Sequence, residues 1–142
     1  MSDVSPDSLS DKPRLFTYGS LMFPKVWKRV AGTDNYSFPA RLGGFEARRL
    51  AGLTYPGLLA VKGGSAAGLL YVGVSTEALH RLDAFEGRRY ERITVHVTVE
   101  GHPEPLEAFT YLLADQDRGT ILPEIWDAEE FRTHHLKDFV YP

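Results

Sequence analysis

Two pairs of adjacent glycines interrupt segments that otherwise have the composition of β-strands. Gly43-Gly44 falls inside the strand-like run 38–50, and Gly63-Gly64 separates two shorter runs at residues 58–61 and 67–74. A glycine has no side chain, so it permits close backbone approach and unusual torsions. Glycines inside strands are therefore typical of a small sheet that bends sharply or closes on itself, and we expect such a sheet here.

Signals for helix starts occur three times along the chain. They are Pro24 in residues 23–30 with Gly32 at the end, Ser75 ahead of a helix through residue 85, and the pair Asp127 and Glu130 ahead of a final helix to about residue 139. Further strand-like runs cover residues 14–18, 92–100 and 108–113. Strands dominate and do not alternate regularly with helices, so the order predicts an α+β fold.

The length and composition indicate one domain. A chain of 142 residues with 43% apolar residues forms one hydrophobic core by default. We expect a single domain at residues 14–142 and a flexible tail at residues 1–13, which lack the basic start and apolar middle of a signal peptide. The longest apolar stretch, residues 66–74, is much shorter than the roughly 20 residues that cross a bilayer. These features predict a cytoplasmic protein without membrane association.

Charge and residue content argue against several classes of function. The formal net charge is −3 and the charges are interspersed, whereas nucleic-acid binding usually needs a clustered basic face. There are no cysteines, which excludes disulfides, thiolate zinc sites and cysteine nucleophiles. The five histidines show no H-E-x-x-H spacing, so no metal site is expected.

The strongest candidate for chemistry is Glu86, at the end of the second predicted helix. Helical spacing places Leu79, Leu82 and Glu86 on one face, in line with the core. Burial raises the pKa of a carboxyl, which allows a glutamate to carry protons near neutral pH. The alternative is a solvated glutamate at a frayed helix end, just before Gly87.

A second candidate is the segment Tyr18-Gly19-Ser20-Leu21, which follows a predicted strand. Gly19 permits a tight turn that brings backbone N–H groups close to an anion such as a carboxylate. The alternative is an ordinary strand-to-helix turn. A nucleophilic role for Ser20 is disfavoured because the surroundings lack G-x-S-x-G and no acid and histidine can be assigned as partners.

Asp83 and Glu86 could form a paired carboxylate site, because residues three apart share a helical face. Such catalytic pairs usually come from separate elements on either side of a substrate. Asp83 is therefore interpreted as a residue that hydrogen-bonds its neighbours.

Charged and aromatic residues follow Glu86 closely. Arg88, Arg89 and Arg92 could pair with a carboxylate of a peptide-like substrate, or form a solvated face. Tyr90 and Tyr111, in or beside predicted strands, could direct hydroxyls inward or pack in the core with the hydroxyl at its edge.

Several motifs occur in a defined order between residues 15 and 113. They are Leu15-Phe16-Thr17-Tyr18-Gly19-Ser20-Leu21, Gly44-Phe45, Tyr55-Pro56-Gly57, Gly68-Leu69-Leu70-Tyr71 and Leu82-Asp83-Ala84-Phe85-Glu86-Gly87-Arg88-Arg89-Tyr90-Glu91-Arg92. Together they resemble the gamma-glutamylcyclotransferase-like superfamily, and most closely its avirulence-induced-gene-like branch. The final helix with His135-Leu136 is similar to that branch as well.

The resemblance implies a small mixed β-barrel, strongly bent or closed, flanked by about three helices. It implies a pocket between the Tyr-Gly-Ser-Leu turn and the glutamate. Tyr18, Gly19, Ser20 and Leu21 correspond to the substrate-binding loop of the superfamily, and Glu86 to its catalytic acid/base. Tyr111 matches a pocket tyrosine, and with Tyr90 it completes the expected substrate-binding residues.

The reaction implied by the resemblance cyclises a γ-glutamyl group to 5-oxoproline and releases an amine or amino acid. Glu86 transfers the protons, and the reaction needs no metal or cofactor. The expected partner is a small γ-glutamyl substrate, and the expected state is a monomer or homodimer. Two alternatives stay open: a non-catalytic binding module for a small anionic metabolite, and a related amide or lactam activity on a γ-glutamylamine.

Overall fold

The computed structural model describes residues 4–7 and 11–140. The strands are β1 (Leu15–Thr17), β2 (Ser37–Leu50), β3 (Gly57–Tyr71), β4 (Tyr90–Val99), β5 (Leu106–Leu113) and β6 (Ile121–Ile125). The helices are α1 (Pro24–Ala31), α2 (Thr76–Glu86), α3 (Ala128–His134) and α4 (Leu136–Val140), with 3-10 turns η1 (Ser20–Met22), η2 (Gly87–Arg89) and η3 (Asp115–Thr120). The predicted α+β class is confirmed.

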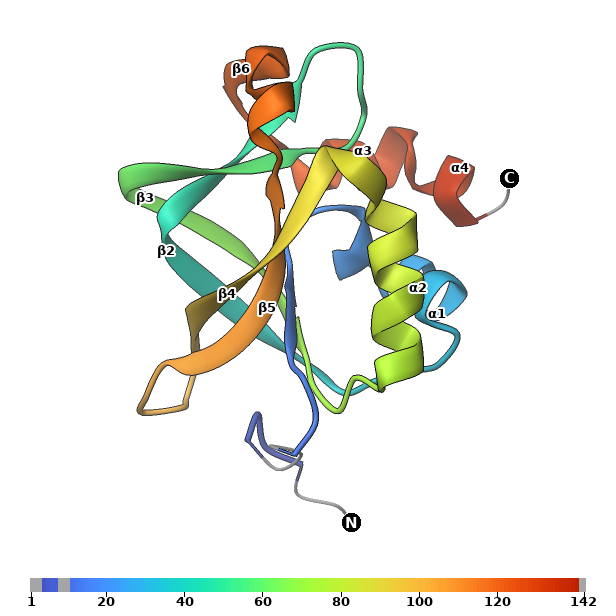
Figure 1. Ribbon diagram of the computed structural model, residues 1–142, viewed down its shortest axis with the longest axis vertical. Coiled ribbons are helices and arrows are strands. Elements are labelled where there is room, and N and C mark those ends of the chain that lie inside the picture. The colour runs from blue at the N-terminus through green and yellow to red at the C-terminus, as the bar shows by residue number, and fades with distance from the viewer. Residues whose placement is uncertain (1–3, 8–10, 141–142) are drawn as a thin grey trace.

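Five of the strands close into a barrel. The sheet order is β3-β1-β5-β4-β2-β6, and an additional pairing of β3 with β2 completes the ring, while β6 extends β2 outside it. β1 is antiparallel to β3 and parallel to β5, so the barrel is mixed. Figure 1 shows the barrel with α1 and α2 together on one of its sides and α4 near the C-terminus. The expected mixed, closed barrel flanked by about three helices is confirmed.

The glycine pairs lie where β2 and β3 change direction. The register between these two strands shifts between Gly43 and Phe45. Gly44 has φ of +83° and Gly63 has φ of +78°, a region that residues with a side chain rarely adopt. The predicted bend is therefore confirmed.

The prediction of two separate strands at residues 58–61 and 67–74 is wrong. They form the single strand β3, because pairing with β2 continues on both sides of Gly63-Gly64. β3 also ends at Tyr71.

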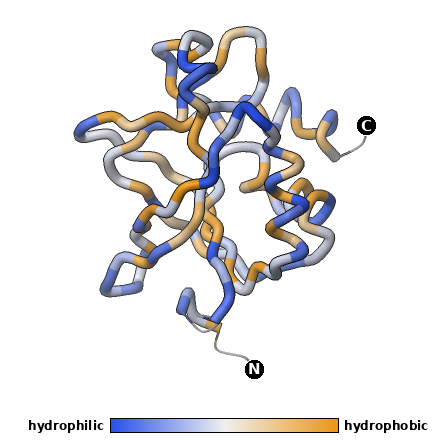
Figure 2. Tube along the Cα trace, in the orientation of Figure 1, coloured by the Kyte–Doolittle hydropathy of each residue, from blue (hydrophilic) through white to orange (hydrophobic). Residues whose placement is uncertain are grey.

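Side chains of the barrel strands divide between two cores. Phe16 of β1 points into the barrel with Leu42, Leu58, Leu70 and other apolar side chains. Its neighbour Leu15 belongs to a second core between the barrel and the helices. Figure 2 shows the resulting change between hydrophobic and hydrophilic residues along the strands. Because successive strand residues face opposite sides, one short strand supports both cores.

The second core fixes α1 and α2 against the barrel. Trp27 of α1 stacks on Tyr71 of β3, with ring centroids 3.8 Å apart. As predicted, Pro24 occupies the first turn of α1, and Gly32 follows the helix in the left-handed conformation. α2 contributes Leu79 and Leu82 to the same core, which sets the rotation of that helix about its axis.

The cap of α2 provides a first testable prediction. Ser75 accepts a hydrogen bond from the Ala78 N–H at 3.1 Å, as its position in the sequence predicts. We expect Ser75→Ala to lower the free energy of unfolding by about 1 kcal/mol, the usual effect of removing an N-cap. Urea denaturation measures this change. Ser75→Asp, which retains the capping oxygen, should keep the wild-type midpoint, and equal midpoints for all three proteins would contradict the assignment.

The C-terminal segment differs from the single helix expected to about residue 139. Asp127 caps α3 by accepting hydrogen bonds from the N–H groups of Glu129 and Glu130 at 2.9 and 3.2 Å. The helix then breaks at His135, with φ of −128° and ψ of −18°, and α4 starts in a new direction. Packing of Phe139 against Phe131, with ring centroids 5.1 Å apart, accompanies this break.

β6 was not predicted from the sequence. This strand contains Pro123 and pairs with the end of β2 through Arg48↔Ile125 and Leu50↔Ile121. Its position at the sheet edge explains why a proline is tolerated, since one side of the strand makes no ladder hydrogen bonds.

The described part of the N-terminal segment touches the domain. The Pro13 carbonyl accepts a hydrogen bond from the Val74 N–H at 3.1 Å, and Asp7 Oδ2 lies 3.5 Å from His102 Nε2. The predicted flexible tail includes residues 1–3 and 8–10, which lie outside the described residues, so its flexibility stays a prediction.

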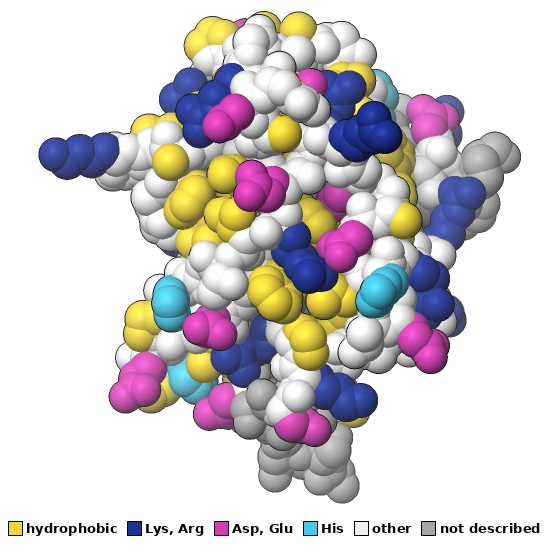
Figure 3. All heavy atoms as spheres, viewed as in Figure 1, with side chains coloured by type: hydrophobic (Ala, Val, Ile, Leu, Met, Phe, Trp, Pro, Cys, Tyr) yellow, Lys and Arg dark blue, Asp and Glu magenta, His cyan; other side chains and the backbone are white. Residues whose placement is uncertain are grey.

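Acidic and basic side chains are intermingled on the face shown in Figure 3. No helix in the described ranges 4–7 and 11–140 is both long enough and apolar enough to span a bilayer.

Candidate active site

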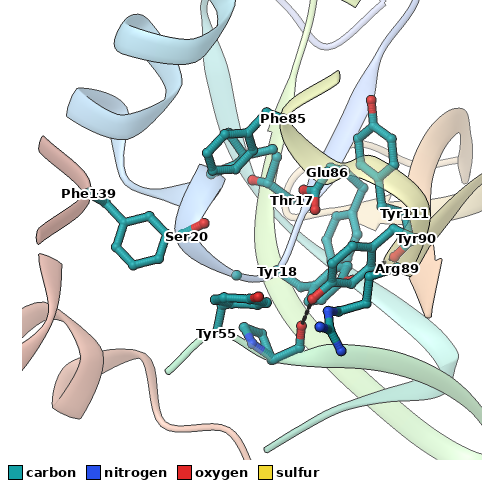
Figure 4. Close-up of a pocket in the computed structure, with 14 residues that line it drawn as sticks. Thr17, Tyr18, Ser20, Tyr55, Phe85, Glu86, Arg89, Tyr90, Tyr111 and Phe139 are labelled. Carbon is teal, nitrogen blue, oxygen red and sulfur yellow. Dashed lines mark hydrogen bonds between the residues drawn. The ribbon is translucent and has the colours of Figure 1, made fainter. Parts of the chain in front are cut away.

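A pocket of about 180 Å³ opens beside β1, where the barrel meets the helices. All the side chains and backbone segments expected to form the site line this one pocket: Tyr18, Gly19, Ser20, Leu21, Glu86, Tyr90 and Tyr111. They come from β1 and the turn after it, from the end of α2, and from β4 and β5. Figure 4 shows these side chains around the pocket.

The turn after β1 lines the pocket with residues 18–21. η1 begins without a side-chain cap, and its internal hydrogen bonds use the N–H groups of Met22 and Phe23. The first N–H groups of a helical turn have no acceptor within the turn, so they are free to bind an anion. A Cβ atom on Gly19 would lie 3.0 Å from Pro56 Cγ and Cδ, which explains a glycine here.

Glu86 is the last residue of α2 and lines the pocket in line with the buried Leu79 and Leu82. Loss of hydration raises the pKa of Glu86 to about 8. In the free pocket the carboxyl is therefore largely protonated at pH 7. The alternative of a solvated glutamate at a frayed helix end does not fit a half-buried carboxyl with this pKa.

The raised pKa of Glu86 makes stability depend on pH. Folded protein keeps the proton up to about pH 8, whereas the unfolded chain releases it near pH 4.5. Between these values the folded state binds more protons, so this carboxyl's contribution to stability is greatest below pH 4.5 and is lost as the pH rises to about 8. The Glu86→Gln side chain has no titratable proton to lose, so the variant does not undergo this decrease in stability.

We therefore expect the stability of Glu86→Gln relative to wild type to increase from pH 5 to pH 8 and then to level off. Urea denaturation of both proteins at a series of pH values measures it. The difference between the two proteins removes the contributions of all other titrating groups. A difference that does not change with pH would show that Glu86 has an ordinary pKa.

Three of the four tyrosines that line the pocket donate their hydroxyl protons to protein acceptors. Tyr18 donates to the Tyr111 carbonyl at 2.6 Å, and Tyr90 donates to the Pro56 carbonyl at 2.6 Å (Figure 4). Tyr111 donates to Asp83 Oδ1 at 2.6 Å, and Asp83 is not among the pocket residues. Burial raises the pKa of all three hydroxyls, so they stay neutral and shape the walls of the pocket.

Asp83 does not form a carboxylate pair with Glu86 across a substrate. Besides the Tyr111 hydroxyl, it accepts a hydrogen bond from Arg92 Nη1 at 2.9 Å. The Arg92 guanidinium also lies over the Phe109 ring, 4.7 Å from its centroid. Asp83 therefore positions Tyr111, which agrees with its interpretation as a residue that hydrogen-bonds its neighbours.

The three arginines after Glu86 have separate environments. Arg88 is exposed and Arg92 binds Asp83. Arg89 lines the pocket, with Nη1 3.4 Å from Asp117 Oδ1. A guanidinium has five N–H donors, so Arg89 retains donors for a ligand.

Sequence reasoning missed four aromatic residues of the pocket: Phe16, Tyr55, Phe85 and Phe139. Tyr55 and Phe85 belong to the motifs that carry the family resemblance, and their place in those motifs could have indicated a position in the site. Phe139 reaches the pocket through α4, and no local pattern indicates that contact. Within residues 4–7 and 11–140, no three His, Asp or Glu side chains are grouped as a metal site would require.

The closed mixed barrel with its flanking helices is the gamma-glutamyl cyclotransferase-like fold. A solved gamma-glutamyl cyclotransferase is similar to it with a TM-score of 0.64, covering 72% of this chain and 67% of that chain at 18% identity. Residues 15–128 match the family described as "Gamma-glutamyl cyclotransferase, AIG2-like", and the chain belongs to that family. The predicted resemblance, including its avirulence-induced-gene-like branch, is confirmed.

Two Arabidopsis thaliana proteins show the relationship to this branch. Protein AIG2 C is 34% identical over 126 residues, which cover 89% of this chain and 76% of the relative. A protein from the same plant whose structure was determined in solution has a TM-score of 0.75 at 33% identity, covering 96% of this chain and 91% of that chain.

Proposed function

We propose that this protein cyclises a γ-glutamyl group to 5-oxoproline and releases an amine or amino acid, with Glu86 as the general acid/base. The proposal rests on the observation that Glu86, whose carboxyl has a pKa of about 8, lines the same pocket as the turn after β1. A base works best when its pKa lies near the working pH. Family membership supports the same class of chemistry.

In the proposed reaction, the α-amine of the γ-glutamyl group attacks its own γ-carbonyl carbon. The new C–N bond closes a five-membered lactam, and the original amide C–N bond breaks. Both reacting groups belong to one molecule, so the protein needs to hold the folded conformer. Such positioning can lower a barrier by roughly 7 to 11 kcal/mol in favourable cases.

Glu86 must accept a proton from the α-ammonium group and return it to the departing nitrogen. As the lactam forms, the attacking nitrogen loses a second proton, which the released amine takes up to become an ammonium ion. The empty pocket favours the neutral carboxyl. An ammonium group next to it favours the carboxylate, because opposite charges stabilise each other at short range. Substrate binding itself would therefore prepare the base, and the carboxylic acid formed by the first transfer is the donor for the second.

The N–H groups of the turn after β1 are suited to the negative charges of this substrate. They can bind the α-carboxylate or the oxyanion that forms as the amine attacks. Neither role uses the tyrosine hydroxyls, whose protons are already donated to the protein.

The proposal is tested by incubating the purified protein with γ-glutamyl dipeptides, glutathione and γ-glutamylamines, and by measuring released 5-oxoproline. We expect repeated turnover of at least one of these substrates. Saturable binding without 5-oxoproline release over long incubation would reject the cyclotransferase and favour the binding module. Release from γ-glutamylamines alone would assign the related activity.

A further inference from the structure

Phe85 is an apolar ring at the mouth of the pocket that remains 42% exposed. Two other large hydrophobic side chains in the described part of the chain are exposed to a similar extent, Tyr36 and Ile125, and neither lines the pocket. An exposed aromatic ring beside a cavity is typical of a surface that a ligand covers.

Two more rings extend this apolar surface. Tyr55, from the loop between β2 and β3, and Phe139 of α4 both line the pocket, with ring centroids 6.3 Å apart in an edge-to-face arrangement. The Phe139 ring also packs on buried Phe131, and the Phe139 carbonyl accepts a hydrogen bond from Arg29. The three rings, Tyr55, Phe85 and Phe139, therefore come from three separate elements. Packing on Phe131 fixes the position of the Phe139 ring.

Charge is distributed unequally around the pocket. Arg89 supplies the positive charge of the pocket lining, and Figure 4 shows it beside Tyr90, on the opposite side from Phe139, with Tyr55 between them. Glu86 lies between these two sides. The end with Tyr55, Phe85 and Phe139 thus offers flat aromatic contact around the Ser20 hydroxyl and has no charged side chain.

We propose that Tyr55, Phe85 and Phe139 form a subsite for the leaving group and select γ-glutamyl compounds whose leaving amine carries an aromatic or large apolar group. This inference rests on the proposed function. If the reacting carbons lie beside Glu86, the released amine must extend toward the opening, and exposed Phe85 marks that opening. An aromatic leaving group would cover the Phe85 ring and remove its apolar surface from water.

The test compares γ-glutamyl-phenylalanine with γ-glutamyl-alanine, which carry the same charges and differ by one phenyl ring. Calorimetry on Glu86→Gln measures both dissociation constants without turnover. We expect the phenylalanine compound to bind at least about tenfold more tightly, since hydrophobic pockets discriminate single methylene groups by about 10- to 200-fold. In Phe85→Ser, made in the same background, this ratio should fall at least threefold.

Ile125→Ser is the matched control, because Ile125 is 57% exposed and does not line the pocket. It should leave the ratio of the two dissociation constants unchanged. Phe85→Leu should retain most of the preference, which separates apolar contact from a change in folding. Equal affinities for the two compounds, or a ratio unaffected by Phe85→Ser, would overturn the inference.

Turnover by wild type separates this inference from the proposed function. Release of 5-oxoproline from both compounds with equal affinities would leave the cyclotransferase intact and reject the aromatic subsite. A large affinity ratio that depends on Phe85, without 5-oxoproline from these two compounds or from the rest of the substrate panel, would support the aromatic subsite as a binding surface and reject the cyclotransferase.

Discussion

Glu86→Gln is expected to lower turnover of a verified γ-glutamyl substrate by about 100- to 10,000-fold, the usual contribution of general acid/base catalysis. The amide keeps the size and shape of the carboxyl but cannot accept the ammonium proton. The substrate dissociation constant should change much less than the turnover number. The measurement is 5-oxoproline release under saturating substrate, with circular dichroism to confirm that the variant is folded.

Glu91→Gln provides the matched control for this result. Glu91 is exposed at the start of β4 and does not line the pocket, so the same chemical change should leave turnover unaffected. In wild type, kcat/KM should rise with pH and reach a plateau above about pH 8, where the free-enzyme carboxylate predominates. Turnover of Glu86→Gln within threefold of wild type would show that another group transfers the protons.

Gly68→Ala is expected to destabilise the protein by about 4 kcal/mol or more, which is an exceptional effect for one methyl group. A Cβ atom at this position would lie 1.9 Å from the Thr17 carbonyl oxygen. Both atoms belong to paired strands of the closed barrel, so neither can move without separating β1 from β3. Thr17 directly precedes the turn at residues 18–21, and the same displacement would disturb the pocket.

The control for this prediction is Gly43→Ala in the neighbouring strand β2. A Cβ atom on Gly43 would meet no atom within 4 Å, so this variant should fold with stability close to that of wild type. Urea denaturation, and soluble yield if Gly68→Ala does not fold, distinguishes the two variants. A Gly68→Ala protein with the wild-type midpoint would mean that β1 and β3 do not approach as closely as described.

Local sequence signals predicted the features that depend on neighbouring residues. Ser75 caps α2 because its hydroxyl reaches an N–H group three residues ahead, and Gly32 ends α1 because it adopts the left-handed conformation. The position of Glu86 was predicted from local sequence as well, because helical periodicity alone puts it in line with Leu79 and Leu82.

Other features could not be predicted because they depend on contacts between distant segments. β6 forms a strand because it pairs with the end of β2, although Pro123 and Glu124 interrupt the strand preference of its two isoleucines. The break between α3 and α4 accompanies packing of Phe139 on Phe131 and a hydrogen bond from Arg29, 110 positions away. Asp83 contacts both Tyr111 and Arg92 because the pairing of β4 with β5 places these two residues opposite each other.

By itself, then, the sequence determined where α1, α2 and α3 begin, where the sheet bends and which carboxyl is in line with the core. These features arise from torsions and hydrogen bonds within a few residues. The tertiary structure decided that the sheet closes, that the Glu86 carboxyl shares a pocket with the turn after β1, and that Phe139 forms part of its wall. Those outcomes depend on which apolar surfaces, distant in the sequence, are buried against each other. No pattern of neighbouring residues specifies these pairings.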